Sequence, residues 1–399
     1  MLFSLSLILI CGFSLGGLMQ KLKLPGLLGM MLTGIILGPF VLNLISPEIL
    51  NISADLRQIA LIVILTRAGL ALDIKDLKKV GRPAILMCFI PATFELFAIT
   101  FLAPIFFGIS YLDAAIMGTV LAAVSPAVVV PRMLKLMENG YGESNRIPQL
   151  IMAGASVDDI YVIVLFTSLL GMHGGQGFDV MSLAKVPIAV ATGVGLGILA
   201  GLICIWLFKK MHIRDTIKIM LLLSVAFFMI TFEEAVKAYL PISGLLAVMA
   251  LGATIFKKYG VLANRLSIKY SKVWVGAELL LFVLVGAAVD ISYVGNAGLQ
   301  TVALIFLALV FRTIGVFLCV AKTKLTSKDR LFCGIAYIPK ATVQAAIGSI
   351  PLALGVSSGN LILTVAVLSI MITAPLGAIG IDLTYKKLLS KSNIKKDNV

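Results

Sequence analysis

Residues 155–160 read Ala-Ser-Val-Asp-Asp-Ile and place two adjacent carboxylates, Asp158 and Asp159, inside an apolar stretch that runs from 147 to 171. An apolar stretch of about 20 residues is long enough to cross the hydrocarbon core of a membrane as a helix. An ionisable side chain at the centre of such a helix costs at least ~2.5–3.5 kcal/mol and is a functional candidate by default. Because successive helical residues point about 100° apart, the two carboxylates cannot both face lipid. The stretch therefore predicts a buried polar site in a membrane helix.

The composition of the whole chain agrees with a membrane protein. Of the 399 residues, 60% are hydrophobic and only 13% are charged, whereas soluble domains have about 45–50% apolar and about 25% charged residues. This excludes a soluble enzyme, a disordered chain and a nucleic-acid-binding protein. The number of cysteines, five, is odd, which argues against a disulfide framework, and they are not spaced like metal ligands, which argues against a zinc site.

Thirteen segments are apolar and long enough to be transmembrane helices. The first follows no basic region, and its lysines come after the apolar run, so we interpret it as a retained helix and not as a signal peptide. The predicted spans are 2–20, 24–44, 57–72, 83–107, 111–133, 147–171, 185–208, 215–232, 240–256, 272–289, 298–321, 329–349 and 359–385.

The basic residues indicate the orientation of these spans. With the connections assigned to alternate sides, 27 of the 33 lysines and arginines fall on one side and three on the other. The remaining three, Arg67, Arg312 and Lys340, lie within spans. Lysine and arginine accumulate on the cytoplasmic side of membrane proteins. The pattern predicts a multi-pass protein of the cell membrane with its N-terminus outside and its C-terminus in the cytoplasm, and it explains the net charge of +14 without nucleic acid.

Two of the predicted spans contain prolines that interrupt a helix. The fifth contains Pro126 within the stretch Ala-Val-Ser-Pro-Ala (123–127), and the twelfth contains Pro339, followed by Lys340. Consecutive spans cross the membrane in alternating directions. Because the fifth and the twelfth span are separated by an odd number of positions in this order, seven, they cross in opposite directions. Two groups of six helices and one linker then form inverted repeats whose interrupted helices cross near the midplane, where secondary transporters place ion sites. Simple proline kinks are the alternative.

Further ionisable residues are predicted within the membrane. Glu95 lies in the fourth span, Glu278 in the tenth, Arg312 in the eleventh and Lys340 in the twelfth. They are candidate charge partners of the aspartates, or ion pairs that only hold helices together. No connection exceeds about 15 residues and no Walker loop is present, so we expect transport to be driven by a gradient.

The sequence resembles the monovalent cation:proton antiporter superfamily, and within it the sodium/hydrogen exchanger-domain clade of Na⁺(Li⁺)/H⁺ antiporters. The resemblance extends from about the second span to the thirteenth. Four motifs carry it: Ser-Val-Asp-Asp (156–159), Thr-Arg-Ala-Gly-Leu (66–70), Val-Ser-Pro-Ala-Val-Val-Val-Pro (124–131) and Pro-Lys-Ala-Thr-Val-Gln-Ala-Ala (339–346).

The resemblance implies an all-α fold of about thirteen transmembrane helices in two inverted repeats, assembled as a homodimer. It implies an ion-translocating core domain at approximately 83–171 and 298–385. A dimerisation domain would occupy approximately 1–72 and 185–289.

The resemblance also assigns roles to the buried residues. Asp159 would be the essential carboxylate that binds either the cation or the proton, with Asp158 beside it and Lys340 in the helix crossing. Many electrogenic members have a lysine at the position of Arg312. Because an arginine does not lose its proton in proteins, we expect Arg312 and Glu95 to form a fixed structural bridge, which puts electrogenic exchange in doubt.

Burial favours the uncharged form of an acid, so a proton and a small hard cation are expected to compete for the oxygens of Asp159. Hard cations prefer oxygen ligands, and the Ser125 and Ser156 hydroxyls, carbonyls freed by the helix breaks and water are further candidates. No cofactor and no enzymatic activity are expected, only transported Na⁺ or Li⁺ and H⁺.

Other functions remain as alternatives at this stage. A K⁺/H⁺ antiporter and an organic-anion symporter are compatible with the same scaffold, the latter because Lys340 offers a cationic contact. An intramembrane aspartyl protease needs its two aspartates on separate helices, and a passive channel would need a selectivity filter, so both are disfavoured.

Overall fold

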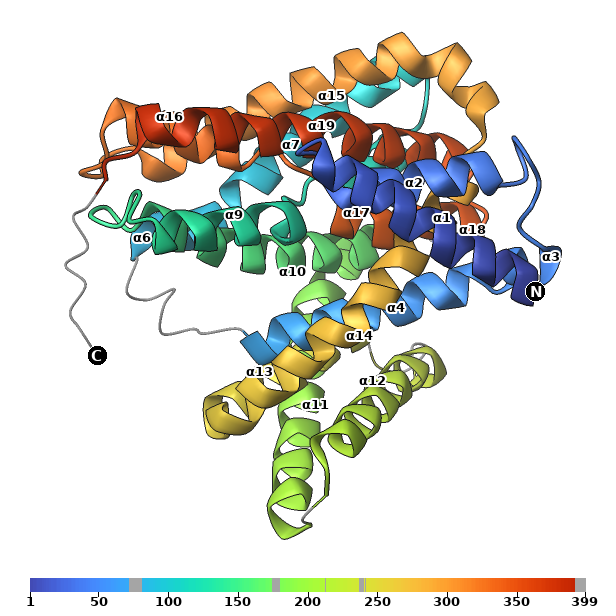
Figure 1. Cartoon of the computed structure of the whole chain (residues 1–399), viewed down its shortest axis with the longest axis vertical. Coiled ribbons are helices and arrows are strands. Elements are labelled where there is room, and N and C mark those ends of the chain that lie inside the picture. Colours follow the sequence, from blue (N-terminus) through green and yellow to red (C-terminus); the bar gives the residue numbers. More distant parts are fainter. Residues whose placement is uncertain (72–80, 174–179, 212, 237–239, 241, 392–399) are drawn as a thin grey trace.

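The computed structural model describes residues 1–71, 81–173, 180–211, 213–236, 240 and 242–391. All regular elements within these residues are helices. The helices form two groups that pack mainly within themselves, one in the upper part of Figure 1 and one extending from the right to the lower part.

The first group contains the N-terminal helices and the helices from the middle of the chain. The closest packing of α14 in this group is against α2 and α4, and α13 lies between α4 and α11. The helices are α1 (Leu2–Lys21), α2 (Gly26–Leu37), α3 (Pro47–Asn51), α4 (Ser53–Ala71), α11 (Val180–Lys210), α12 (Asp215–Val236), α13 (Gly244–Lys258) and α14 (Gly260–Ala287).

The second group contains both predicted helix breaks and the aspartate pair. Here α7 packs between α8 and α15, and α10 lies against α6, α8 and α9. The helices are α6 (Arg82–Met87), α7 (Ile90–Phe107), α8 (Tyr111–Leu121), α9 (Pro126–Glu138), α10 (Ile147–His173), α15 (Ile291–Val320), α16 (Ser327–Ala336), α17 (Thr342–Ile347), α18 (Ile350–Ala353) and α19 (Gly359–Leu388).

Helices of membrane-spanning length dominate the described part of the chain. Nine helical stretches there are long and apolar enough to cross a bilayer, and Gly26–Leu37 and Thr342–Ala353 are shorter apolar stretches. The nine are Leu2–Lys21, Arg82–Phe107, Tyr111–Glu138, Ile147–Met172, Ala191–Lys210, Asp215–Val236, Gly260–Ala287, Gly298–Val320 and Gly359–Leu388. The structure thus confirms an all-helical membrane fold, while the count of thirteen spans stays a prediction.

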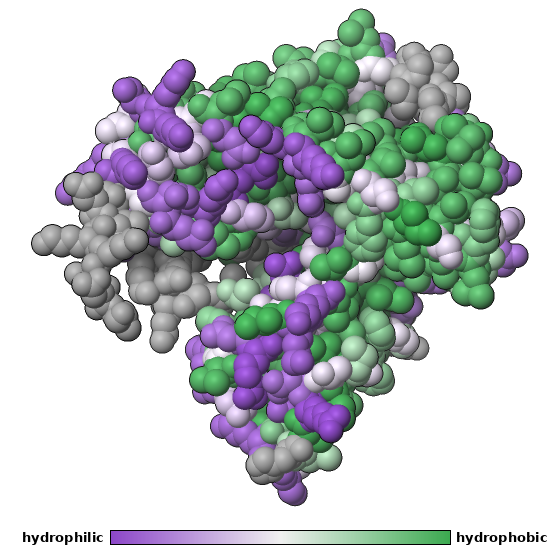
Figure 2. Space-filling model, in the orientation of Figure 1, coloured by the Kyte–Doolittle hydropathy of each residue, from purple (hydrophilic) through white to green (hydrophobic). Residues whose placement is uncertain are grey.

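The molecular surface exposes large apolar side chains over much of its area, as Figure 2 shows on its upper right. Ile105 is 79% exposed and Phe228 is 70% exposed. Extended apolar surface is rare on soluble monomers because it leaves hydrocarbon in contact with water. This apolar surface is therefore suited to contact with lipid.

Several helix boundaries differ from the predicted spans, and the largest difference is at the start of the tenth. The helix predicted at 272–289 begins at Gly260 as α14. Its added turns are amphipathic, with Leu262, Leu266 and Tyr270 buried and Arg265 exposed. A search for uniformly apolar stretches misses such an extension because its polar face lowers the average hydropathy, whereas its apolar face packs within the protein.

Small residues bring helices of the first group into backbone contact. Three glycines of α11 face α13: a Cβ atom built on Gly197 would lie 2.3 Å from the Ala247 carbonyl oxygen, and those on Gly193 and Gly201 would be similarly close to Ser243 and Thr254. Small residues at four-residue spacing permit such close approach. This stripe therefore serves packing within the chain.

We expect Gly197→Ala to lower the free energy of unfolding by about 1–3 kcal/mol, because the added methyl group forces α11 and α13 apart. Gly195 is the matched control, since a Cβ atom there meets nothing within 4 Å and alanine has the higher helix propensity. The melting temperature in detergent should therefore fall in Gly197→Ala and stay the same or rise in Gly195→Ala. Equal shifts would contradict the packing argument.

Candidate ion-binding site

The two interrupted helices meet at their breaks. Residues 122–125 separate α8 from α9, and residues 337–341 separate α16 from α17. The Ser125 backbone N–H donates to the Pro339 carbonyl oxygen over 2.8 Å. Pro126 begins α9 at its first turn, where its missing N–H costs nothing. The contact joins two segments more than 200 positions apart, so the crossing of the broken helices is present.

Asp158 on α10 is fixed against this crossing. Its Oδ2 atom accepts hydrogen bonds from the Val124 backbone N–H over 2.8 Å and from Arg312 Nη2 over 3.0 Å. The side chain is fully buried. One oxygen of Asp158 is thus occupied by a backbone donor and a guanidinium, and its negative charge has a direct counter-charge.

Arg312 on α15 connects four segments. Its Nε atom donates to the Tyr337 carbonyl oxygen over 2.7 Å, and its Nη1 atom donates to Glu95 Oε2 over 2.8 Å and to the Ala122 carbonyl oxygen. With the Asp158 contact, the guanidinium binds two carboxylates and one carbonyl from each helix break. The Tyr337 ring also lies 5.5 Å beneath it. The guanidinium thus joins α7, α10 and both helix breaks.

Lys340 lies within the second break and pairs with Glu95. Its Nζ atom is 2.6 Å from Glu95 Oε1 and 2.7 Å from Glu95 Oε2, and it also donates to the Leu121 carbonyl oxygen. Its backbone N–H donates to Thr373 Oγ1 over 3.0 Å. Glu95 therefore balances the charges of both Lys340 and Arg312, although the three residues come from different segments of the chain.

Gln344 on α17 completes the crossing and was not singled out by the sequence. Its Nε2 atom donates to the carbonyl oxygens of Ala123, over 2.8 Å, and Leu121, over 3.3 Å. The carbonyls of the two breaks that accept from Arg312, Lys340, Gln344 and Ser125 are thus satisfied by protein donors. Cation binding by other carbonyls of the breaks, one of the possibilities drawn from the sequence, stays a prediction. The sequence feature that could have identified Gln344 is a single amide side chain inside an apolar span.

Six side-chain oxygens at the crossing are buried and lack hydrogen-bond and ion-pair partners among the described residues. Three belong to the first break and the aspartate pair, Asp158 Oδ1, Asp159 Oδ1 and Ser125 Oγ, and three to the second break and α17, Tyr337 Oη, Thr342 Oγ1 and Gln344 Oε1. Buried polar atoms are normally satisfied, so unpaired oxygens at one place mark a position for a cation, a proton or water. The Ser156 side chain, a further predicted ligand, lies outside the described part of the structure.

The charges of this cluster nearly cancel. Arg312 and Lys340 carry two positive charges, and Glu95 and Asp158 carry two negative charges. The contacts above pair each of them with an opposite charge. Asp159 adds one further negative charge and has no ion pair among the described contacts. The crossing therefore has one carboxylate to be neutralised from outside the protein.

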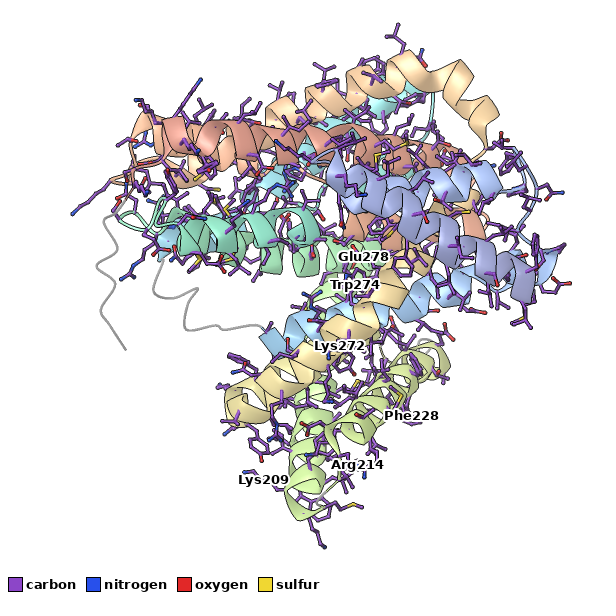
Figure 3. All side chains as sticks on the ribbon, in the orientation of Figure 1. Lys209, Arg214, Phe228, Lys272, Trp274 and Glu278 are labelled. Atoms are coloured by element: carbon purple, nitrogen blue, oxygen red, sulfur yellow. The ribbon has the colours of Figure 1, made fainter. Side chains whose placement is uncertain are left out.

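A cavity of about 610 Å³ leads toward the crossing between the two helix groups. Its walls include Ala127 and Val128, which directly follow Pro126 on α9, and Glu278 on α14. Figure 3 labels Glu278 on α14, with Lys272 nearer the beginning of the same helix. Glu278 lies within electrostatic range of Arg67 on α4. It lines the approach and takes no part in the crossing.

Crossed helix breaks around buried, charge-balanced acids define a secondary transporter, since irregular backbone persists at membrane depth only where protein or a polar cavity satisfies it. Three comparisons with known proteins agree. A family model described as "Sodium/hydrogen exchanger, transmembrane" matches residues 5–387. The chain belongs to the sodium/hydrogen exchanger family.

Individual relatives match over nearly the whole chain. Sodium/hydrogen exchanger 9B2 of Mus musculus is 34% identical over 408 residues, which cover 98% of this chain and 74% of that protein. The Homo sapiens protein of the same name is 34% identical over 412 residues, which cover 98% of this chain and 75% of that protein. The solved structure of the sodium proton antiporter MjNhaP1 from Methanocaldococcus jannaschii superposes with a TM-score of 0.84 at 21% identity and covers 96% of this chain and 97% of that one.

These findings confirm the predictions of the family, of the antiporter fold and of sodium/proton exchange. They also confirm a membrane setting with Na⁺ and H⁺ as the transported ions. The homodimer, the orientation of the termini and the cell membrane as location stay predictions.

Proposed function

We propose that the protein exchanges Na⁺ or Li⁺ for H⁺ across the cell membrane by alternating access, with both ions competing for Asp159. The observation that carries this proposal is the set of unpaired buried oxygens that Asp158, Asp159 and Ser125 contribute to the crossing. Oxygen atoms of carboxylates and hydroxyls suit a hard monovalent cation, by analogy with other hard cations. The same carboxylate binds a proton equally well, which makes occupancy mutually exclusive.

Asp159, and not Asp158, is the exchanging acid in this proposal. Asp158 keeps its charge in this proposal because Arg312 and the Val124 N–H donate to one of its oxygens, and protonation of the carboxylate would weaken both contacts. Asp159 has no such partner among the described residues, and a bound ion would neutralise it inside the membrane. The free oxygen of Asp158 then serves as a ligand beside it.

Movement of the core is permitted only when Asp159 is neutralised. The moving unit is proposed to be the core formed by 83–171 and 298–385, which slides against a dimerisation scaffold formed by 1–72 and 185–289. Carrying an uncompensated charge through the apolar contact between them would be prohibitively costly. Since the other four charges cancel, a core loaded with either H⁺ or Na⁺ has the same net charge, and exchange is one-for-one and electroneutral.

The same charge balance disfavours organic-anion symport. That mechanism needs a cationic side chain free to bind the anion, but Lys340 and Arg312 are both engaged by carboxylates and carbonyls. K⁺/H⁺ exchange remains the second candidate, because an oxygen site at this crossing does not by itself distinguish alkali cations.

The test uses purified protein in proteoliposomes with a trapped pH dye. Adding Na⁺ or Li⁺ to acid-loaded vesicles should discharge the pH gradient, while K⁺ should act weakly and choline not at all. In Na⁺ assays with a potential imposed by valinomycin and K⁺, the initial rate should be independent of the size and sign of the potential. A rate that changes severalfold with potential would overturn the electroneutral mechanism, and a response restricted to K⁺ would favour the second candidate.

A further inference from the structure

The cavity between the helix groups carries more positive than negative side chains, although a cation must travel through it. Its charged lining consists of Lys23, Arg132, Lys135, Glu278 and Asp382. The lysines lie on the side that the distribution of basic residues predicts to be cytoplasmic. A cleft with an excess of one sign lowers the local concentration of ions of that sign. An uncompensated cavity of this kind would repel cytoplasmic Na⁺.

Arg132 and Asp382 form an ion pair on the cavity wall. Arg132 Nε lies 3.3 Å from Asp382 Oδ2, and Arg132 Nη1 donates to the Val128 carbonyl oxygen over 3.0 Å. The second contact ties the guanidinium to α9 one turn from the break. Arg132 is only 20% exposed, whereas Asp382 on α19 is 51% exposed and can contact the water in the cavity. The carboxylate of the pair is therefore more exposed to the water in the cavity than the guanidinium is.

The pair lies close enough to the crossing to act on a cation there. Arg132 follows Ser125 by seven residues on α9, which corresponds to about 10 Å along a helix axis. Charges at that separation interact appreciably at low ionic strength and much less in concentrated salt, because the Debye length falls from about 30 Å at 0.01 M to about 3 Å at 1 M.

We propose that Asp382 raises the apparent affinity for the cytoplasmic cation by offsetting the positive charge of Arg132 on the wall of the cavity. The pair sets the apparent affinity for Na⁺ from that side and leaves the chemistry at Asp159 unchanged. The inference rests on the proposed exchange and on the predicted cytoplasmic orientation of the cavity.

The test measures the KM for Na⁺ in everted membrane vesicles, which expose the cytoplasmic face, and in right-side-out vesicles. At low ionic strength, Asp382→Asn should raise the cytoplasmic KM about threefold and Arg132→Gln should lower it about threefold. The double variant should return close to the wild-type value because its net charge is unchanged. All shifts should fade when choline chloride is raised to roughly 0.5 M, and none should appear from the outer face.

Arg265→Gln is the matched control. Arg265 forms a similar surface ion pair with Asp215, 3.1 Å apart, outside the cavity lining, so its KM should equal the wild-type value. Arg132→Lys keeps the charge and should keep the KM, and the amount of protein and its melting temperature are measured for every variant. Unchanged KM values in Asp382→Asn and Arg132→Gln, or equal shifts from both faces, would overturn the proposal. Failure of the proposed exchange is distinguishable, because the wild-type protein itself would then not respond to Na⁺.

Discussion

Asp159→Asn is expected to reduce Na⁺-driven and Li⁺-driven proton exchange to the level of vesicles without protein. Asparagine has the size of the protonated aspartate but binds neither a proton nor a cation strongly. If Asp159 is the shared ligand, the variant core is permanently neutral and carries nothing in either direction. The measurement is the dye assay in proteoliposomes with Na⁺ and Li⁺, normalised to the amount of reconstituted protein.

The stability of the same variant separates loss of transport from loss of fold. Asp159 has no ion pair among the described contacts, so removing its charge should leave the melting temperature unchanged or raise it slightly. Asp158→Asn should instead lower it, because Arg312 and the Val124 N–H lose an anionic acceptor. Glu138→Gln removes an exposed carboxylate at the end of α9 and should change neither property. Exchange at the normal rate by Asp159→Asn would remove the central assignment.

The features predictable from the sequence are those that the membrane enforces locally. Each predicted span contains helix, because a backbone in lipid must satisfy its own hydrogen bonds. Pro126 and Pro339 mark the two breaks because proline removes a backbone donor. The buried aspartates stand out since charges in an apolar stretch are costly. All three signals are read within a short window of sequence.

The features that could not be predicted from the sequence depend on contacts between distant segments. Arg312 was expected to pair with Glu95, 217 positions away, but which aspartate it binds, and that it also binds one carbonyl of each helix break, was not predicted. Hydrophobic periodicity does not specify which carboxylate meets which cation. The role of Gln344 in satisfying the carbonyls of the other break, and the packing of the α11 glycines against α13, likewise follow only from the three-dimensional arrangement.

Arg312→Ala is expected to destabilise the protein strongly, by about 3–5 kcal/mol, because it leaves the buried carboxylate of Asp158 without its counter-charge and removes one of the two counter-charges of Glu95. Glu95 retains Lys340, but Asp158 loses its cation, and the Ala122 and Tyr337 carbonyls lose their donors. The helix breaks would then lack the bridge between them. The melting temperature in detergent should fall well below that of the wild type.

The ratio of Na⁺ to Li⁺ transport should survive in whatever Arg312→Ala protein remains folded, since Arg312 contacts no unpaired oxygen of the proposed site. Arg265→Ala, which breaks a surface ion pair, should cost no more than about 1 kcal/mol and serves as the control. Adding Asp158→Asn to Arg312→Ala should recover part of the lost stability, because it removes the uncompensated charge. Intact thermal stability together with lost transport would contradict a structural role and place Arg312 in the ion-binding step itself.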